Sequence, residues 1–202
     1  MPEVCANCVL VVDDDPSICG LLSRHLENAG FQAIHAKDGI DALVKLRDTL
    51  PKVIISDLQM PRMSGFEFIG VVRRRFPTIP VIALSGSFPS EFPGETKPDC
   101  WFEKNIQRFP DLLHVVNELA RKTPDNTYLP QVVTSPTRTR PGFAGYFMLA
   151  CTDCLRTFRV MSAPGNKAME GTAVCTHCDA RVPFLIESSP PELTEKPVPR
   201  VA

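Results

Sequence analysis

A short apolar run that ends in a carboxylate is the feature that most limits what this chain can fold into. Residues 53–57, with the sequence VIISD, are mostly β-branched and apolar before the aspartate. Such a continuous run is typical of a strand buried on both faces of a parallel sheet. A segment with Pro61 and Gly65 follows directly, which indicates a turn. We therefore expect Asp57 to lie at the carboxyl edge of a central strand, where it is presented to a ligand.

Strands and helices are predicted to alternate along the first 122 residues. Strands are expected over 9–12, 31–36, 53–57, 80–84 and 100–103, and helices over 16–29, 39–50, 64–75 and about 110–121, with Asp15 as the first N-cap. Because each parallel connection needs a crossover, this pattern favours an α/β domain with helices on both faces of a parallel sheet. Residues 88–98 contain three prolines and a glycine where a fourth helix is due, so we expect an irregular loop there.

The composition argues against several classes of partner and location. The formal net charge is −1 and the pI is near 6.4, so there is no general electrostatic attraction to nucleic acid or to an anionic membrane. No apolar run reaches the roughly eighteen residues that a membrane span requires. The N-terminus lacks the basic start and apolar core of a signal peptide. We therefore expect a cytoplasmic protein without a membrane partner.

Five polar or charged side chains follow the predicted strands at the points where the strands end. They are Asp13, Asp14, Asp57, Ser85 and Lys104. The carboxyl ends of parallel strands share one edge of a sheet, so we expect these side chains to meet there. Two carboxylates about 4 Å apart repel by about 4 kcal/mol at an effective dielectric near 20, so the acids need a cation. Carboxylates with room for water suit Mg²⁺, and such a site favours phosphoryl transfer to Asp57.

Four motifs at these strand ends resemble the receiver domain of two-component response regulators. They are VVDDDP at 11–16, SDLQMPRMSG at 56–65, LSG at 84–86 and WFEK at 101–104. The resemblance covers about residues 7–122. It implies a response regulator of a phosphorelay with a flavodoxin-like fold, in which a five-stranded parallel sheet has the order 2-1-3-4-5 and the fourth helix is degenerate.

The resemblance also implies a role for each acid and for the lysine. Asp57 would accept a phosphoryl group from a histidine kinase or a histidine phosphotransfer protein, and Lys104 would pair with that group. Asp14, Asp57 and the backbone carbonyl of Gln59 would bind Mg²⁺, while Asp13 would act largely through water. The phosphoryl group would then add negative charge and three acceptor oxygens to Asp57.

Two residues are expected to convert phosphorylation into a change of packing. By resemblance, Ser85 would hydrogen-bond to the phosphoryl group, and Trp101 would be an aromatic rotamer switch that fills the space Ser85 vacates. Asn105 follows Lys104 where the family usually has proline, so we expect a trans peptide bond at that position. The alternative hypothesis is a constitutive adaptor whose N-terminal domain is a pseudo-receiver scaffold that is not phosphorylated.

An enzyme is not expected, beyond self-catalysed phosphorylation from small donors and self-catalysed loss of phosphate. Phosphatases with an aspartyl nucleophile commonly carry a second acid two positions later, and that position is Gln59 here. The chain is therefore predicted to be a phosphoacceptor in signalling.

Two Cys-x-x-Cys pairs separated by twenty residues lie near the C-terminus. They are Cys151 with Cys154 and Cys175 with Cys178, a spacing that suits one tetrahedral Zn²⁺. Strands are predicted over 155–161, 168–174 and 182–186, with a turn at 164–166, so the module resembles a zinc ribbon. All four positions of the metal would be filled by thiolates, which indicates a structural role. Redox-active dithiols are the competing interpretation.

The predicted domain organisation has four parts. They are a receiver domain at 1–122, a flexible linker at 123–142, the zinc-ribbon-like module at 143–187 and a disordered tail at 188–202. The module carries four basic and four acidic residues, so a protein partner is favoured and nucleic acid stays possible but is not favoured. Cys5 and Cys8 form a third pair that we interpret as incidental, and the alternative interpretation is a surface metal or redox site.

Overall fold

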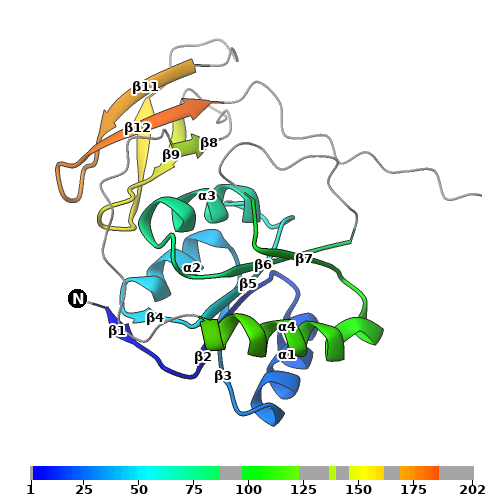
Figure 1. Cartoon of the computed structure of the whole chain (residues 1–202). Coiled ribbons are helices and arrows are strands. Elements are labelled where there is room, and N and C mark those ends of the chain that lie inside the picture. The colour runs from blue at the N-terminus through cyan, green and yellow to red at the C-terminus, as the bar shows by residue number, and fades with distance from the viewer. Residues whose placement is uncertain (1, 87–96, 123–136, 140–145, 162–168, 187–202) are drawn as a thin grey trace, which may run out of the picture.

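A five-stranded parallel sheet forms the centre of the N-terminal domain (Figure 1). The computed structural model describes residues 2–86, 97–122, 137–139, 146–161 and 169–186. In spatial order the strands are β3 (Gln32–Ala36), β2 (Cys8–Val12), β5 (Val53–Asp57), β6 (Val81–Ser85) and β7 (Cys100–Glu103). Counted along the chain, these five strands have the order 2-1-3-4-5. The predicted flavodoxin-like sheet is therefore confirmed.

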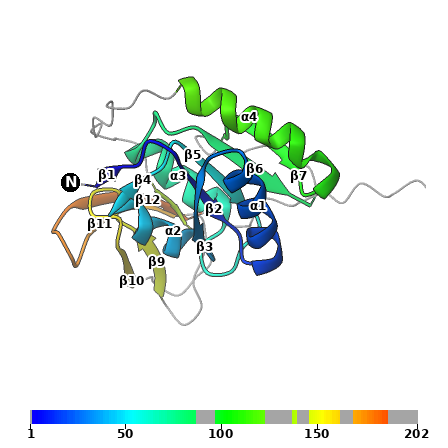
Figure 2. The same ribbon diagram turned by 90° about the horizontal axis from the view of Figure 1, so that it is seen from below.

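Helices cover both faces of the sheet (Figures 1 and 2). Helices α1 (Pro16–Asn28) and α4 (Phe109–Lys122) cover one face, and α2 (Gly39–Leu46) and α3 (Gly65–Arg75) cover the other. A 3-10 turn, η1 (Ile106–Arg108), precedes α4. Along β2, Val9 and Val11 face the α1–α4 side, whereas Leu10 and Val12 face the α2–α3 side. Both faces of the strand are apolar because both are buried.

Side-chain caps fix where the helices begin. Asp15 accepts a hydrogen bond of 2.8 Å from the Ser17 amide at the start of α1, as the sequence predicts. Asp38 caps α2 in the same way. Helix α3 begins with a capping box in which Ser64 and Glu67 satisfy each other's backbone amides.

The predicted second helix, over 39–50, is too long. Helix α2 ends at Leu46, and Thr49–Leu50 forms the short strand β4, which pairs in parallel with β1 (Glu3–Val4). Pro51 explains the difference, because the residue before a proline is held in an extended conformation. The amide of Cys5 also donates to the carbonyl of Leu50 at 3.0 Å, so the N-terminal residues are held along this segment.

The C-terminal module consists of short strands around a small core. They are β8 (Thr137–Thr139), β9 (Tyr146–Ala150), β10 (Thr157–Met161), β11 (Met169–Val174) and β12 (Arg181–Ile186). β9 and β10 form one antiparallel pair, and β11, β12 and β8 form a second sheet. Phe147, Phe158 and Phe184 are among the buried side chains between the sheets. Three of these strands match the prediction, but β8 and β9 were not predicted.

Part of the predicted linker is a strand. Residues 137–139 form β8, which pairs in parallel with β12, so the prediction of a flexible linker over 123–142 is wrong for these residues. Thr137 and Thr139 are buried, and the Thr139 hydroxyl donates to the Met148 carbonyl at 2.8 Å. Prolines at 136 and 141 give the segment the composition of a linker. Its β structure depends on a partner more than forty residues later, which local sequence does not reveal.

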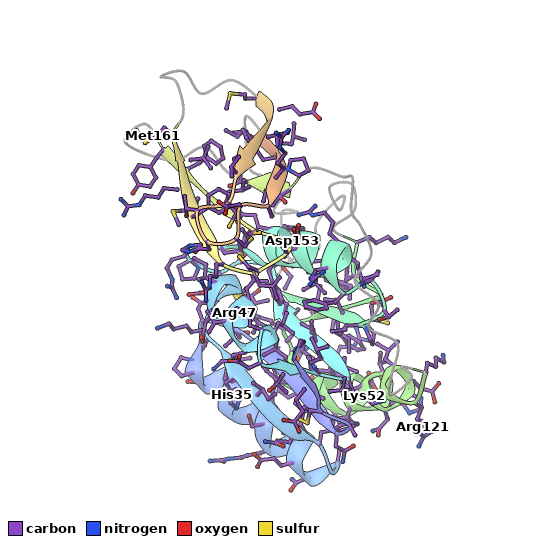
Figure 3. The ribbon with its side chains drawn as sticks, turned by 90° about the vertical axis from the view of Figure 1, so that its left-hand side faces the viewer. His35, Arg47, Lys52, Arg121, Asp153 and Met161 are labelled. Carbon is purple, nitrogen blue, oxygen red and sulfur yellow. A yellow bond between two sulfur atoms is a disulfide. The ribbon has the colours of Figure 1, made fainter. Side chains whose placement is uncertain are left out.

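The C-terminal module packs directly on the N-terminal domain. Strand β8 lies beside α3 (Figure 1). Ala150 and Leu155 belong to the same buried cluster as the side chains under α2 and α3. Figure 3 shows Asp153 of the module next to α3, while Met161 lies at the far end of the module. The two parts therefore share a core, which the sequence analysis did not anticipate.

Several predictions concern residues outside the described ranges. These are the irregular loop at 88–98 for all but its last two residues, the linker at 123–136 and 140–142, the turn at 164–166 and the tail at 188–202. Among the described residues, every helix is too short or too polar to span a lipid bilayer.

Gly65 places the start of α3 against the backbone of Asp57. A Cβ atom built on Gly65 would overlap the Asp57 carbonyl oxygen, and the Gly65 amide donates to the Leu58 carbonyl at 3.1 Å. By contrast, a Cβ atom built on Gly20, within α1, meets nothing within 4 Å. Glycine is therefore required at position 65 by a close approach of two backbones, and not at position 20.

The two glycines give a matched prediction for stability. We expect Gly65→Ala to destabilise the protein by about 1–3 kcal/mol, because the added methyl group forces α3 away from β5. Gly20→Ala should stabilise it by about 0.5–1 kcal/mol, because alanine is the better helix former and has room. Urea unfolding midpoints measure both effects. A Gly65→Ala protein as stable as the wild type would contradict the packing described here.

Candidate functional site

Three carboxylates meet at the carboxyl edge of the sheet. Asp13 and Asp14 follow β2, and Asp57 ends β5, the neighbouring strand. One oxygen of each lies within 4.8 Å of one oxygen of the others. Asp13 and Asp57 are buried, with 2% and 3% of their surface exposed, whereas Asp14 is exposed. The parallel register of β2 and β5 therefore brings Asp57 to Asp13 and Asp14, although it is far from them in the sequence.

Lys104 reaches into this cluster from the end of β7. Its Nζ lies 2.8 Å from Oδ2 of Asp57 and 2.9 Å from Oδ2 of Asp13. The Lys104 amide donates to the Ser85 carbonyl at 2.9 Å, which holds the backbone of the lysine against β6. No described peptide bond is cis, so the bond between Lys104 and Asn105 is trans, as expected.

The cluster has more negative than positive charge. Burial raises the pKa of Asp57 above its ordinary value, although hydrogen bonds from Lys104 and from the Gln59 amide oppose the shift. Burial also acts to lower the pKa of Lys104, but its hydrogen bond to Asp57 and its ion pair with Asp13 prevail and raise it. The lysine therefore stays protonated and offsets part of the charge of the acids. A second cation would stabilise the ionised form of Asp57 further.

The oxygen atoms present fit a hard divalent cation. Oδ1 of Asp13 accepts the Asp15 amide at 3.0 Å, and Oδ2 accepts no hydrogen bond of standard geometry despite its charge contact with Lys104. Asp14 is exposed, so its side of the cluster is open to solvent and to water ligands. Carboxylates together with water are the donor set that Mg²⁺ prefers. Asp13, Asp14 and Asp57 would hold the ion, which would supply charge neutralisation for a phosphoryl group.

Three further predicted site residues lie on the strands or loops of the same domain. Gln59 is exposed, and its amide donates to Oδ1 of Asp57 at 3.1 Å. Ser85 is fully buried at the end of β6, one residue beyond Leu84, the β-sheet partner of Asp57. Trp101 is half-buried in the edge strand β7 and packs against the α2–α3 cluster. The roles predicted for these residues stay predictions.

An open groove adjoins the acidic cluster on the side of α1, β3 and α2. Its volume is about 400 Å³. The residues that line it are Asp13, Asp14, Pro16, Cys19, Gly20, His35, Ala36, Lys37 and Asp41. Cys19 lies in the wall of this groove. Burial raises the pKa of its thiol to about 11, so the thiol is protonated at neutral pH. His35, Lys37 and Asp41 were not predicted, because they carry no motif and only the fold brings them beside the site.

The four C-terminal cysteines form a second candidate metal site. All four sulfur atoms lie within 4.8 Å of one another. The distances from Cys151 Sγ to Cys178 Sγ and from Cys154 Sγ to Cys175 Sγ are both 3.7 Å. A tetrahedron with Zn–S bonds of about 2.3 Å has edges of about 3.8 Å, so the geometry fits Zn²⁺. Amides of the two loops donate to Cys151 and Cys175 sulfurs at 3.4 Å, as is suitable for thiolates.

The third cysteine pair does not belong to this cluster. Cys5 and Cys8 are joined in a disulfide beside the short strands β1 and β4. Their sulfurs are therefore not available to a metal in this state. Cys19 is buried and Cys100 half-buried, and both are free thiols.

Comparisons with known proteins agree with this geometry. Residues 9–92 match the family described as the response regulator receiver domain. The nitrogen assimilation regulatory protein NtrX of Azorhizobium caulinodans is 37% identical over 83 residues, which are 40% of this chain and 18% of that protein. Protein PilG of Pseudomonas aeruginosa is 38% identical over 79 residues, which are 38% of this chain and 58% of PilG. The chain thus spans less than two thirds of these curated relatives.

A solved structure shows a likeness over a larger share of the chain. The chemotaxis protein CheY4 of Vibrio cholerae is 33% identical, with a TM-score of 0.52, and the likeness covers 56% of this chain and 98% of that one. The match includes the strands that carry Asp57 and the acids after β2. The N-terminal part of this chain therefore belongs to the response regulator receiver family.

Proposed function

We propose that this protein is a phosphoacceptor of a phosphorelay, in which Asp57 takes a phosphoryl group and the change alters protein contacts. The observation that carries the proposal is the convergence of two further acids, Asp13 and Asp14, and of Lys104 on Asp57. A purely structural cluster would gain stability by pairing each buried acid. Here two buried acids share one lysine, and the pKa of Asp57 is raised.

The transfer step follows from the positions of these groups. An ionised oxygen of Asp57 attacks the phosphorus of the donor, a phosphorus–oxygen bond forms, and the bond from phosphorus to the donor atom breaks. The leaving group departs with the electron pair of that bond and takes a proton from solvent. Lys104 would stabilise the negative charge on the phosphoryl oxygens, since its Nζ lies 2.8 Å from Oδ2 of Asp57. Bound Mg²⁺ would add to this neutralisation.

The donor is proposed to be a histidine kinase or a histidine phosphotransfer protein. The exposed side of Asp14 gives such a donor access to the acids. Small acyl phosphates are proposed to act as donors as well, because binding and charge neutralisation are supplied by this chain. Beyond this transfer and the later hydrolysis of the acyl phosphate, we propose no enzymatic activity.

The response to phosphorylation is proposed to involve Ser85 and Trp101. The Ser85 hydroxyl lies on the strand beside Asp57, within the buried part of the sheet edge. Movement of this hydroxyl towards the phosphoryl oxygens would leave space for the half-buried ring of Trp101. Such a rearrangement changes the surface near β7.

The cysteine cluster is proposed to hold one structural Zn²⁺. A small module has little buried surface, and four thiolates on zinc can contribute about 10–16 kcal/mol of binding free energy to folding. The module is proposed to contact a protein partner, since its charges balance. This arrangement makes the ribbon the effector part of the molecule.

Phosphorylation of Asp57 is the first test. The chain is incubated with Mg²⁺ and acetyl phosphate, and the wild type should acquire one acid-stable, alkali-labile phosphate. Asp57→Asn should remove this incorporation, because an amide oxygen is a poor nucleophile. Asp48→Asn is the matched control, since Asp48 is exposed at the start of the β4 segment and should leave incorporation unchanged. No incorporation in the wild type would favour the alternative of a constitutive pseudo-receiver adaptor.

Metal binding by the module is the second test. The purified chain should contain one zinc ion, and Cys175→Ser should lose it and unfold the module, because a hydroxyl is a much weaker zinc ligand than a thiolate. Cys100→Ser, outside the cluster, is the control and should keep the metal. Elemental analysis and the circular dichroism of the β strands provide the measurements. A Cys175→Ser protein with full zinc content would rule out the four-cysteine site.

A further inference from the structure

The two cysteine loops of the ribbon are built alike. In the first loop the Leu155 amide donates to the Cys151 carbonyl at 3.0 Å, and in the second the Asp179 amide donates to the Cys175 carbonyl at 3.0 Å. The residue after the second cysteine has a positive φ in both, 56° at Leu155 and 58° at Asp179. The two loops can therefore be compared position by position.

Corresponding positions differ in burial. Ala150 precedes the first loop and is 2% exposed, whereas Val174 precedes the second and is 57% exposed. Leu155 ends the first loop and is 5% exposed, whereas Asp179 is exposed. Buried apolar residues therefore flank the first loop, which lies on the N-terminal domain. Polar or exposed residues flank the second loop, which faces away from that domain.

Leu155 is an unfavourable choice for its own backbone conformation. A left-handed conformation suits aspartate, as in the second loop, and costs free energy for leucine. The leucine side chain is instead buried in the cluster that includes Met60, Met63 and Phe66. Burial of its apolar surface offsets the backbone cost only while the ribbon is docked. The sequence of the first loop is thus suited to docking and not to folding of the ribbon alone.

The segment that follows Asp57 belongs to the same buried cluster as Leu155. Met60 and Met63 belong to this segment, and the Met63 carbonyl accepts the Gly39 amide of α2 at 3.3 Å. Gly65 packs its backbone on the Asp57 carbonyl, so the start of α3 lies directly against the phosphoacceptor strand. Strand β8 of the ribbon lies beside α3. A continuous set of packed groups therefore joins Asp57 to the ribbon.

We propose that the first cysteine loop, through Leu155, docks the ribbon on the α2–α3 face, and that zinc in the ribbon and phosphate on Asp57 are thereby energetically coupled. The docking stands on the packing alone, and the coupling to phosphate rests on the proposed function. Zinc holds the loop in the shape that presents Leu155. By reciprocity, a change at the 58–65 segment on phosphorylation alters the affinity of the ribbon for zinc.

Leu155→Asp copies the second loop and separates docking from folding of the ribbon. The variant should still bind one zinc ion, because aspartate accepts the left-handed conformation, but the ribbon should undock. Val174→Asp is the matched control, since it introduces the same charge at an exposed site of the same module. Hydrogen exchange of α3 amides in the full chain is measured with zinc and after removal by a chelator.

In the wild type and in Val174→Asp, removal of zinc should speed exchange of α3 amides about fivefold or more. In Leu155→Asp, exchange should already be fast with zinc bound and should not change further on chelation. The docking proposal would be overturned if zinc removal left the exchange rate of wild-type α3 amides unchanged. It would also be overturned if α3 of Leu155→Asp exchanged as in the wild type.

Zinc affinity is then measured by competition, before and after treatment with Mg²⁺ and acetyl phosphate. The zinc dissociation constant of the wild type should change about fivefold or more on phosphorylation, and those of Leu155→Asp and Asp57→Asn should not change. Phosphate incorporation without any shift would overturn the coupling alone. A lack of incorporation would instead count against the proposed function and leave the exchange result as the test of docking.

Discussion

The proximity of three carboxylates at one edge of the sheet is the constraint on which the rest of the account depends. Asp13, Asp14 and Asp57 come from two neighbouring strands, and Lys104 from a third offers one positive charge to two buried acids. Burial removes the water that would otherwise screen these charges, so the ionised form of Asp57 is disfavoured until a further cation arrives. The same excess of negative charge that costs stability favours the binding of a divalent ion, and a bound ion would in turn attract an anionic phosphoryl group.

The ribbon packs on the domain that carries this site, so a change at the site can affect the ribbon. Its first cysteine loop and strand β8 pack on the α2–α3 side, and Met60 and Met63 of the segment after Asp57 belong to the same buried cluster as Leu155. The packing differs from that of two domains on a flexible tether, because the buried cluster is shared. Arg62 of the same segment pairs with Asp38, the N-cap of α2, so the segment is held from both sides. A structural change at Asp57 would therefore act on packed side chains at the interface with the ribbon.

Sequence alone predicted the features that depend on local pattern or on the rules of parallel sheets. Asp57 could be placed because its strand is buried on both faces and so has a continuous apolar run, and the four ribbon cysteines could be grouped by spacing. Strands such as β8 escaped prediction because three residues between prolines gain β structure only from β12. The docking of Leu155 also escaped, since a leucine after a cysteine loop carries no local sign of its partner. The positive φ of Leu155 becomes informative only beside the equivalent Asp179.

Thermal unfolding of the wild type and of Asp57→Asn, with and without Mg²⁺, tests the central claim most directly. A carboxyl group whose pKa is raised by folding destabilises the folded state above that pKa, and the effect disappears as the pH falls below the unfolded value. At pH 7 without Mg²⁺ the Asp57→Asn protein should therefore melt at a higher temperature than the wild type, with the difference shrinking towards pH 4. Mg²⁺ should raise the melting temperature of the wild type and narrow the gap. A wild type that melts above Asp57→Asn at pH 7 without Mg²⁺, or that does not respond to the ion, would contradict the account.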